Sequence, residues 1–180
     1  MKALILNGSG HSDGFTSAMC QSASDALTGK GIETLLVYLG TLSIKHCTGC
    51  LGCRKGRNCV IRDDDMPTIY DEMQNVDIVI MASPIRFSGP SSQIKTVMDR
   101  MNPYWYVKYP HPEYAAAMLC AGGNEPNFRN AVSEMKSMSN TVGMEWAGEL
   151  EISRTDDMTV DQAASKARDF AIALADMMLK

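Results

Sequence analysis

Short apolar runs alternate with stretches of helical periodicity along the whole chain. Strands are predicted at five runs rich in apolar residues: 3–6, 33–39, 77–82, 115–120 and about 145–152. Helices are predicted where apolar residues recur at intervals of three and four: about 15–30, from about 66, 91–101, about 127–142 and from 159 onward. This alternation predicts a doubly wound α/β fold, in which helices cover both faces of a five-stranded parallel sheet.

The pattern contains no internal repeat, low-complexity tract or linker, so residues 1–180 are predicted to form one domain. One connection, about 40–65, is longer than the others and is predicted to be an inserted loop that carries most of the cysteines. It ends in Asp63, Asp64 and Asp65, where capping of the following helix is favoured over a magnesium site. In folds of this class, ligands bind beyond the carboxyl ends of the strands, between the first strand and the third.

The loop after the first strand is rich in glycine and in hydroxyl side chains. The N–H groups and the dipole at the start of the following helix favour an anion. A Walker A motif is absent, because no lysine lies between Gly8 and Ser17, and the dinucleotide fingerprint fails at Asp13. The available side-chain donors are Ser9, His11, Ser12, Thr16 and Ser17. Neutral donors of this kind favour a terminal monophosphate, as in flavin mononucleotide (FMN), and the alternative is an ordinary capped turn.

Composition limits the classes of function. A net charge of −4 argues against nucleic acid as the main partner. No apolar stretch approaches the ~18 residues of a membrane span, and the first residues lack the charged-then-apolar plan of a signal peptide. We therefore expect no membrane partner and a cytoplasmic location, where the six cysteines are reduced thiols or ligands.

Four of these cysteines form the most specific motif in the chain, Cys47-x2-Cys50-x2-Cys53-x5-Cys59. Compact runs of this kind hold iron–sulfur clusters, whereas zinc sites more often use two separated Cys-x2-Cys pairs. The spacing therefore favours a [4Fe–4S] cluster over thiols without metal, and both over zinc.

Basic residues surround the cysteine run at Lys45, Arg54, Lys55, Arg57 and Arg62. Such cations favour an anionic cluster, and they also suit the docking of an acidic electron carrier.

The sequence resembles the iron–sulfur flavoproteins, within the flavodoxin-like NAD(P)H-dependent FMN reductases. The resemblance is carried by residues 7–17, 47–61, 63–66, 83–85, 93–100 and 122–123. It implies a flavodoxin-like fold, bound FMN, a [4Fe–4S] cluster on the four cysteines, and assembly into homodimers or tetramers. It also implies that electrons pass between the two centres.

The resemblance assigns further residues to the flavin. Ser9, His11, Ser12, Thr16 and Ser17 match its phosphate loop, Pro84, Ile85, Arg86 and Phe87 match the segment beside its ring, and Ala121, Gly122 and Gly123 match the loop at its other edge. Relatives usually carry an aromatic residue where this chain has Arg86. A guanidinium there would stack on the ring, meet a nicotinamide cofactor's phosphate, or point into solvent.

The leading hypothesis is an FMN oxidoreductase that exchanges two electrons with NAD(P)H, a quinone or another small acceptor and passes single electrons to the cluster. The alternatives are a cluster-free NAD(P)H-dependent FMN or quinone reductase, a non-enzymatic one-electron carrier that docks to a ferredoxin-type partner, and a zinc-bound regulatory module. An aromatic segment, 104–114, is interpreted as sheet cover or dimer interface, or as a lid over the flavin.

Overall fold

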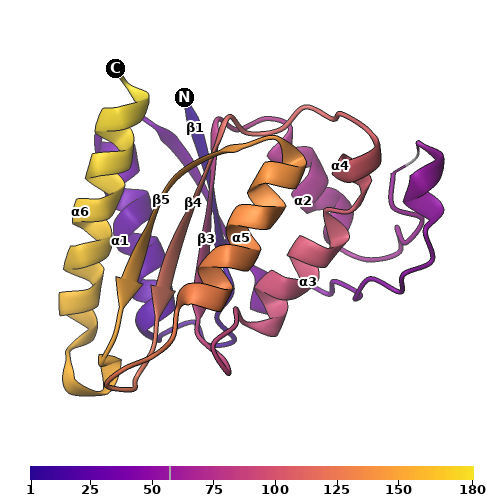
Figure 1. Ribbon diagram of the computed structural model, residues 1–180. Helices are drawn as coiled ribbons and strands as arrows, with labels where there is room; N and C mark the ends of the chain where they lie inside the picture. The colour runs from indigo at the N-terminus through magenta and orange to yellow at the C-terminus, as the bar shows by residue number, and fades with distance from the viewer. Residues whose placement is uncertain (57) are drawn as a thin grey trace.

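The computed structural model describes residues 1–56 and 58–180 and forms a layered α/β structure (Figure 1). Five parallel strands lie in the order β2-β1-β3-β4-β5. Their bounds are β1 (Lys2–Asn7), β2 (Glu33–Tyr38), β3 (Ile78–Pro84), β4 (Tyr114–Cys120) and β5 (Glu145–Ile152). The predicted fold class is confirmed, because both the all-parallel sheet and the reversal of strand order at β1 and β3 are present.

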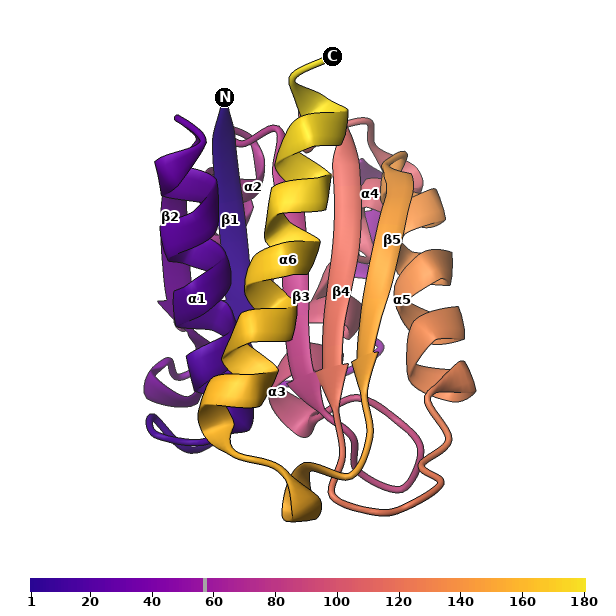
Figure 2. The ribbon, with the colours of Figure 1, turned by 90° about the vertical axis from the view of Figure 1, so that its left-hand side faces the viewer.

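Helices cover both faces of this sheet, and Figure 2 looks onto one face, with helices in front of and behind the strands. The helices packed on one face are α1 (Phe15–Gly29) and α6 (Val160–Met178). Those on the other are α2 (Met66–Met73), α3 (Ser92–Arg100), α4 (Pro103–Tyr106) and α5 (Arg129–Val142). The short α4 was not predicted. The described residues also contain the 3-10 turns η1 (Leu39–Thr41), η2 (Gly52–Lys55) and η3 (Thr155–Asp157).

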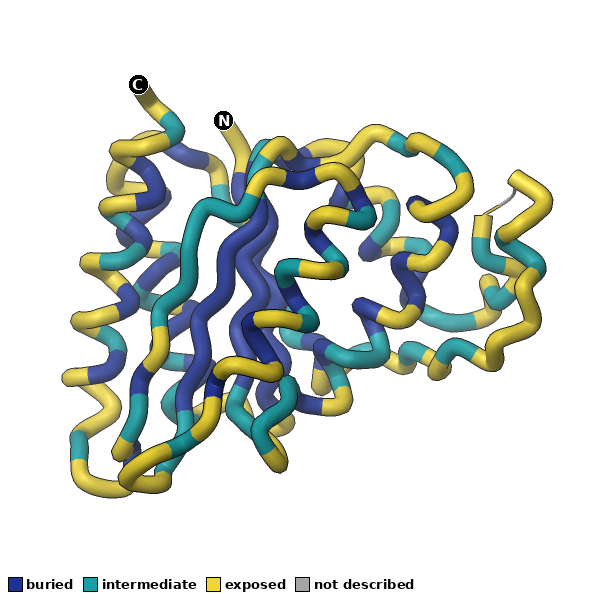
Figure 3. The backbone as a smooth tube through the Cα atoms, viewed as in Figure 1, coloured by how far each residue is buried: buried dark blue, intermediate teal, exposed yellow. Residues whose placement is uncertain are grey.

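The core has two apolar layers, one on each side of the sheet. In β1, β3 and β4 almost every residue is buried, which is why these strands appear as unbroken apolar runs in the sequence (Figure 3). The edge strands β2 and β5 are only partly buried and contain polar residues. Within the described residues, no helix combines the length and apolar character that crossing a membrane requires.

Helix starts depend on local hydrogen bonds. Thr159 and Gln162 form the predicted capping box at α6. Ser91 caps α3 by accepting the N–H of Ile94. At α2 the N-cap is Asp65, but its side chain makes no cap hydrogen bond. The predicted capping role therefore holds only for its neighbour Asp64, whose Oδ1 accepts the N–H of Met66 at 3.2 Å.

Candidate functional site

The loops that follow β1, β3 and β4 lie together at the carboxyl edge of the sheet, at the lower end of the strands in Figure 2. Backbone hydrogen bonds join them. The N–H of Gly8 donates to the carbonyl of Ala82 at 2.8 Å, and the N–H of Ile85 donates to the carbonyl of Cys120 at 2.9 Å. The three segments predicted to contact a flavin are therefore neighbours at the place where this fold binds ligands.

The β1–α1 loop is held in shape by its own side chains. Asn7, fully buried at the end of β1, accepts the N–H of Ser9 at 2.9 Å and donates to Ser17 Oγ at 2.9 Å. Ser17 Oγ donates in turn to the carbonyl of His11 at 2.7 Å, and Ser9 Oγ accepts the N–H of His11 at 3.0 Å. Sequence analysis missed Asn7, although a polar residue closing an apolar strand is a usable signal.

This network divides the predicted phosphate contacts into two groups. Ser9 and Ser17 already bond within the loop, and Thr16 Oγ1 lies 3.3 Å from Cys120 Sγ. His11 and Ser12 are exposed. The N-cap of α1 is Gly14, which has no side chain to accept the N–H groups of the first helical turn. The first turn of α1 thus lacks a side-chain cap, and an anion at this edge would suit its N–H groups.

The β3–α3 loop contains a tight turn in a strained conformation. Arg86 and Gly89 exchange N–H···O hydrogen bonds, each of 2.9 Å. The two residues between them, Phe87 and Ser88, both have positive φ, 48° and 64°. Non-glycine residues adopt this region at a cost of about 1–2 kcal/mol each. Phe87 is also fully exposed. Strain and an exposed aromatic ring make this turn a candidate contact surface.

The β4–α5 loop packs closely against η3. A Cβ atom at Gly122 would lie 2.5 Å from both carboxylate oxygens of Asp156. The N–H of Thr155 donates to the carbonyl of Ala121, and the N–H of Arg154 to that of Gly123, both at 3.1 Å. The exposed backbone of Gly123 is therefore fixed at the edge of the candidate flavin site.

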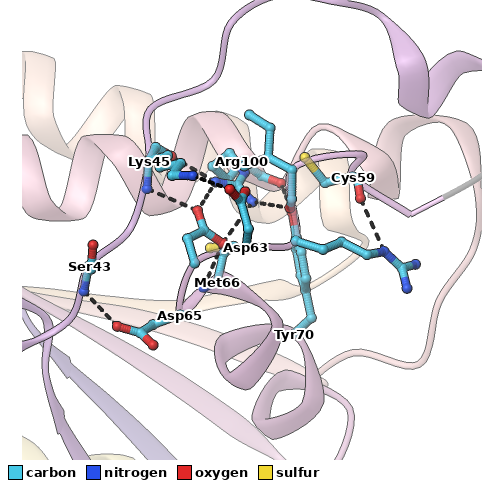
Figure 4. Close-up of polar contacts among 11 residues, drawn as sticks. Ser43, Lys45, Cys59, Asp63, Asp65, Met66, Tyr70 and Arg100 are labelled. Atoms are coloured by element: carbon cyan, nitrogen blue, oxygen red, sulfur yellow. Dashed lines mark hydrogen bonds and ion pairs between the residues drawn. The ribbon is translucent and has the colours of Figure 1, made fainter.

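The cysteine loop leaves the sheet on the α2–α3–α4 side and is closed at its base by the three adjacent aspartates (Figures 1 and 4). Asp65 Oδ2 accepts the N–H of Ser43 at 2.6 Å, and Asp64 Oδ2 accepts the N–H of Lys45 at 2.9 Å. The Lys45 ammonium pairs with Asp63. The aspartates therefore join the two ends of the loop, which is a role that the sequence did not predict.

Arg100, the last residue of α3, reinforces this closure from inside. Its buried guanidinium donates through Nη1 to Asp64 Oδ2 at 2.6 Å and to the carbonyl of Lys45 at 2.7 Å. Nη2 donates to the carbonyl of Ile61 at 2.9 Å. The hydroxyl of Tyr70 donates to the carbonyl of Arg100 (Figure 4). One cation thus holds both sides of the loop.

All four motif cysteines line one small cavity, together with Arg100 and Pro103. Burial raises the pKa of the Cys53 thiol, and the neighbouring Cys59, Cys47 and Cys50 raise it further. The N–H of Gly52 lowers the pKa of Cys50 and so favours its thiolate. Backbone N–H donors and clustered thiols suit an anionic iron–sulfur centre.

The predicted metal site is not formed as a compact group. Among residues 1–56 and 58–180, no three histidine, cysteine or acidic side chains lie where they could share one metal ion. A tetrahedral zinc ion, with Zn–S bonds of about 2.3 Å, requires such a group. The described thiols therefore form no preorganised site for a single zinc ion.

Two further predictions concern the surroundings of this loop. Of the predicted basic residues, Arg57 lies outside the described residues, whereas Arg54 and Lys55 are exposed. The aromatic segment does not cover the carboxyl edge. Tyr104 is buried, with its ring centroid 6.4 Å from that of Tyr70 in α2, and α4 contacts η2 of the cysteine loop. Its position therefore argues against a lid over the flavin.

This strand order, with three ligand loops at one edge, defines a flavodoxin-like α/β protein. The solved NAD(P)H:quinone oxidoreductase from Methanothermobacter marburgensis has the same fold, with a TM-score of 0.76 at 15% identity over 97% of this chain and 96% of that chain. Residues 1–155 match the family described as NADPH-dependent FMN reductase. The chain belongs to this family of flavin-dependent oxidoreductases, as the sequence resemblance indicated.

Curated relatives carry the name iron-sulfur flavoprotein. One from Methanocaldococcus jannaschii is 35% identical over 103 residues, which are 57% of this chain and 53% of that protein. Another, from Archaeoglobus fulgidus, is 33% identical over 123 residues, which are 68% of this chain and 56% of that protein. The matched part thus spans little more than half the length of these relatives.

Proposed function

We propose that this chain is an FMN-dependent oxidoreductase that also holds a [4Fe–4S] cluster on Cys47, Cys50, Cys53 and Cys59. The observation that carries the proposal is that four cysteines line one cavity in a chain of the FMN reductase family. The names of the relatives from M. jannaschii and A. fulgidus support the cluster. In this proposal NAD(P)H or a quinone exchanges two electrons at the flavin, and single electrons pass to the cluster.

The protein's part is to bind and orient these groups. FMN, when bound, supplies the redox chemistry. The first-turn N–H groups of α1, with Ser12 and His11 beside them, would hold its phosphate. The strained turn at Arg86 and Phe87 would lie beside its ring, and the fixed backbone of Gly122 and Gly123 would approach the other edge. The buried network of Asn7 keeps the phosphate loop in shape before the ligand arrives.

We further propose that the chain acts as a homodimer or tetramer. Phe87 is fully exposed, and Trp105 in α4 is largely exposed. Exposed aromatic side chains are enriched where proteins associate. The exposed Arg54 and Lys55 near the cysteines suit an acidic electron carrier of the ferredoxin type.

Purification without oxygen tests the cofactors directly. We expect FMN and about four iron and four sulfide per chain. Cys53→Ser should lose the iron and keep the flavin, whereas Cys20→Ser, which changes a buried cysteine of α1 outside the motif, should keep both. Flavin without iron above trace in the wild-type protein would contradict the cluster.

A second candidate is a cluster-free NAD(P)H-dependent FMN or quinone reductase. It is favoured by the lack of a compact metal-binding group in the described parts of the chain. Mixing the oxidised protein rapidly with NADH or NADPH separates the enzyme hypotheses from a one-electron carrier. Direct bleaching of the flavin is expected for either reductase, and its absence with both nucleotides would favour the carrier.

A further inference from the structure

Arg100 carries an unused hydrogen-bond donor. The Nε atom of this side chain is buried, and it makes no hydrogen bond to any of the described residues, 1–56 and 58–180. Its Nη1 and Nη2 are both engaged, with Asp64 and with backbone carbonyls. A buried donor without a partner costs about 1–3 kcal/mol. This arrangement is therefore expected to persist only if something in the site accepts from Nε.

The surroundings of Arg100 identify the kind of acceptor. Arg100 lines the same cavity as the four motif cysteines. Burial acts to lower the pKa of Arg100, but its hydrogen bond to Asp64 and the charge of Cys59 outweigh burial and raise it. Its two carbonyl acceptors, at Lys45 and Ile61, each lie two positions outside the cysteine run. Of the other side chains in this lining that can accept, Asp99 already pairs with Lys95, so the four sulfurs are the most numerous acceptors near Nε.

We propose that Arg100 positions the cysteine loop and that its Nε–H donates a hydrogen bond to sulfur in this cavity, either the Cys59 thiolate or a sulfide of the cluster. The second part rests on the proposed function. Hydrogen bonds to the sulfurs of an iron–sulfur cluster raise its reduction potential. Asp64 balances the positive charge of the guanidinium. Arg100 therefore acts on the reduction potential mainly through the hydrogen bond from its Nε–H and less through its charge.

Arg100→Lys tests the donor, because lysine keeps the positive charge and loses the planar fork. The control is Arg168→Lys, an equivalent change at an exposed residue of α6, outside the cysteine loop. In anaerobically purified protein, the midpoint potential of the cluster, followed by electron paramagnetic resonance, should become more negative in Arg100→Lys and stay unchanged in Arg168→Lys. Equal potentials in wild type and Arg100→Lys would overturn the proposed hydrogen bond.

Thiol labelling of the iron-free protein tests the positioning role without any cluster. Loss of the clamp should speed alkylation of Cys47 and Cys59 about tenfold, which corresponds to about 1.4 kcal/mol of local stability. The buried Cys20 and Cys120 serve as internal references and should not change. Unchanged rates at Cys47 and Cys59 would overturn the positioning role.

These two measurements separate this inference from the proposed function. If wild-type protein binds no iron but Arg100→Lys still labels faster, the cluster hypothesis fails and the clamp stands. If Arg100→Lys does not fold, Asp64→Asn provides the second test, because it keeps Arg100 and removes the charge that balances it. The cluster potential should then become more positive, and an unchanged potential would contradict a role for Arg100.

Discussion

Replacing Gly8 with alanine should destabilise the protein at the junction between β1 and α3. A Cβ atom at this position would lie 2.4 Å from Ile94 Cγ1, 2.7 Å from Ser91 Oγ and 3.0 Å from the carbonyl oxygen of Ala82. Ser91 caps α3, and Ala82 accepts the N–H of Gly8, so neither neighbour can move without loss. The added methyl group must therefore displace the phosphate loop or the start of α3.

Overpacking of this kind costs about 1–3 kcal/mol. For a chain of 180 residues, each kcal/mol lowers the melting temperature by about 2–4 °C. We therefore expect Gly8→Ala to melt about 2–12 °C below wild type. Gly10→Ala is the matched control in the same loop, because a Cβ there meets only Gln93 Nε2 at 3.7 Å, which is an ordinary contact.

Thermal unfolding of the flavin-free proteins, followed by circular dichroism, measures this difference without any contribution from ligand binding. Quenching of flavin fluorescence then compares FMN affinity between wild type and Gly8→Ala, and a weaker affinity is expected because the phosphate loop has moved. If Gly8→Ala were as stable as Gly10→Ala, the close packing of β1 against α3 described above would be wrong.

Substitutions in the β1–α1 loop and in the cysteine loop give three further expected outcomes. Ser17→Ala should cost about 1–3 kcal/mol in chemical denaturation, because it leaves the buried Asn7 amide without its acceptor, whereas Ser12→Ala at an exposed position should cost under about 0.5 kcal/mol. Burial would raise the pKa of Asp64, but hydrogen bonds from Arg100 and two backbone N–H groups outweigh it and lower the pKa. The ionised Asp64 therefore stabilises the fold fully above the ordinary aspartate pKa of about 3.9, and this stabilisation is lost as the pH falls through the lower pKa of the folded state. In Asp64→Asn the free energy of unfolding should depend less on pH in this range. Identical acid denaturation curves for wild type and Asp64→Asn would contradict the pairing. Gly52→Ala should reduce the iron bound per chain, since its Cβ would lie 2.6 Å from Val60 Cγ1, and adding Val60→Ala should restore it.

The fold was predictable because its signals are local. The central strands are buried on both faces, so their apolar runs are visible without knowledge of their partners. The capping box at Thr159 lies within one helical turn. The short α4 was missed because four residues around a proline provide too little periodicity.

The site was only partly predictable, because several of its contacts join residues far apart in the sequence. The sequence indicated the phosphate loop and the cysteine run, but Arg100 reaches Lys45 and Asp64 across 55 and 36 positions. In the sequence Arg100 is simply a charged residue at a helix end. Likewise, Asp65 has the composition of a helix cap, yet its carboxylate accepts from Ser43, because closing the loop competes with capping.

These long-range contacts give α3 a particular place in the molecule. Its first turn packs on the phosphate loop through Ser91 and Ile94, and its last residue, Arg100, holds the cysteine loop. Nine helical residues at 1.5 Å each extend about 13 Å. A helix of this length transmits displacement along its axis but bends little. The candidate flavin edge and the cysteine cavity are therefore attached to opposite ends of one rigid element, and a change that displaces the start of α3, such as Gly8→Ala, should also alter the labelling rates of Cys47 and Cys59.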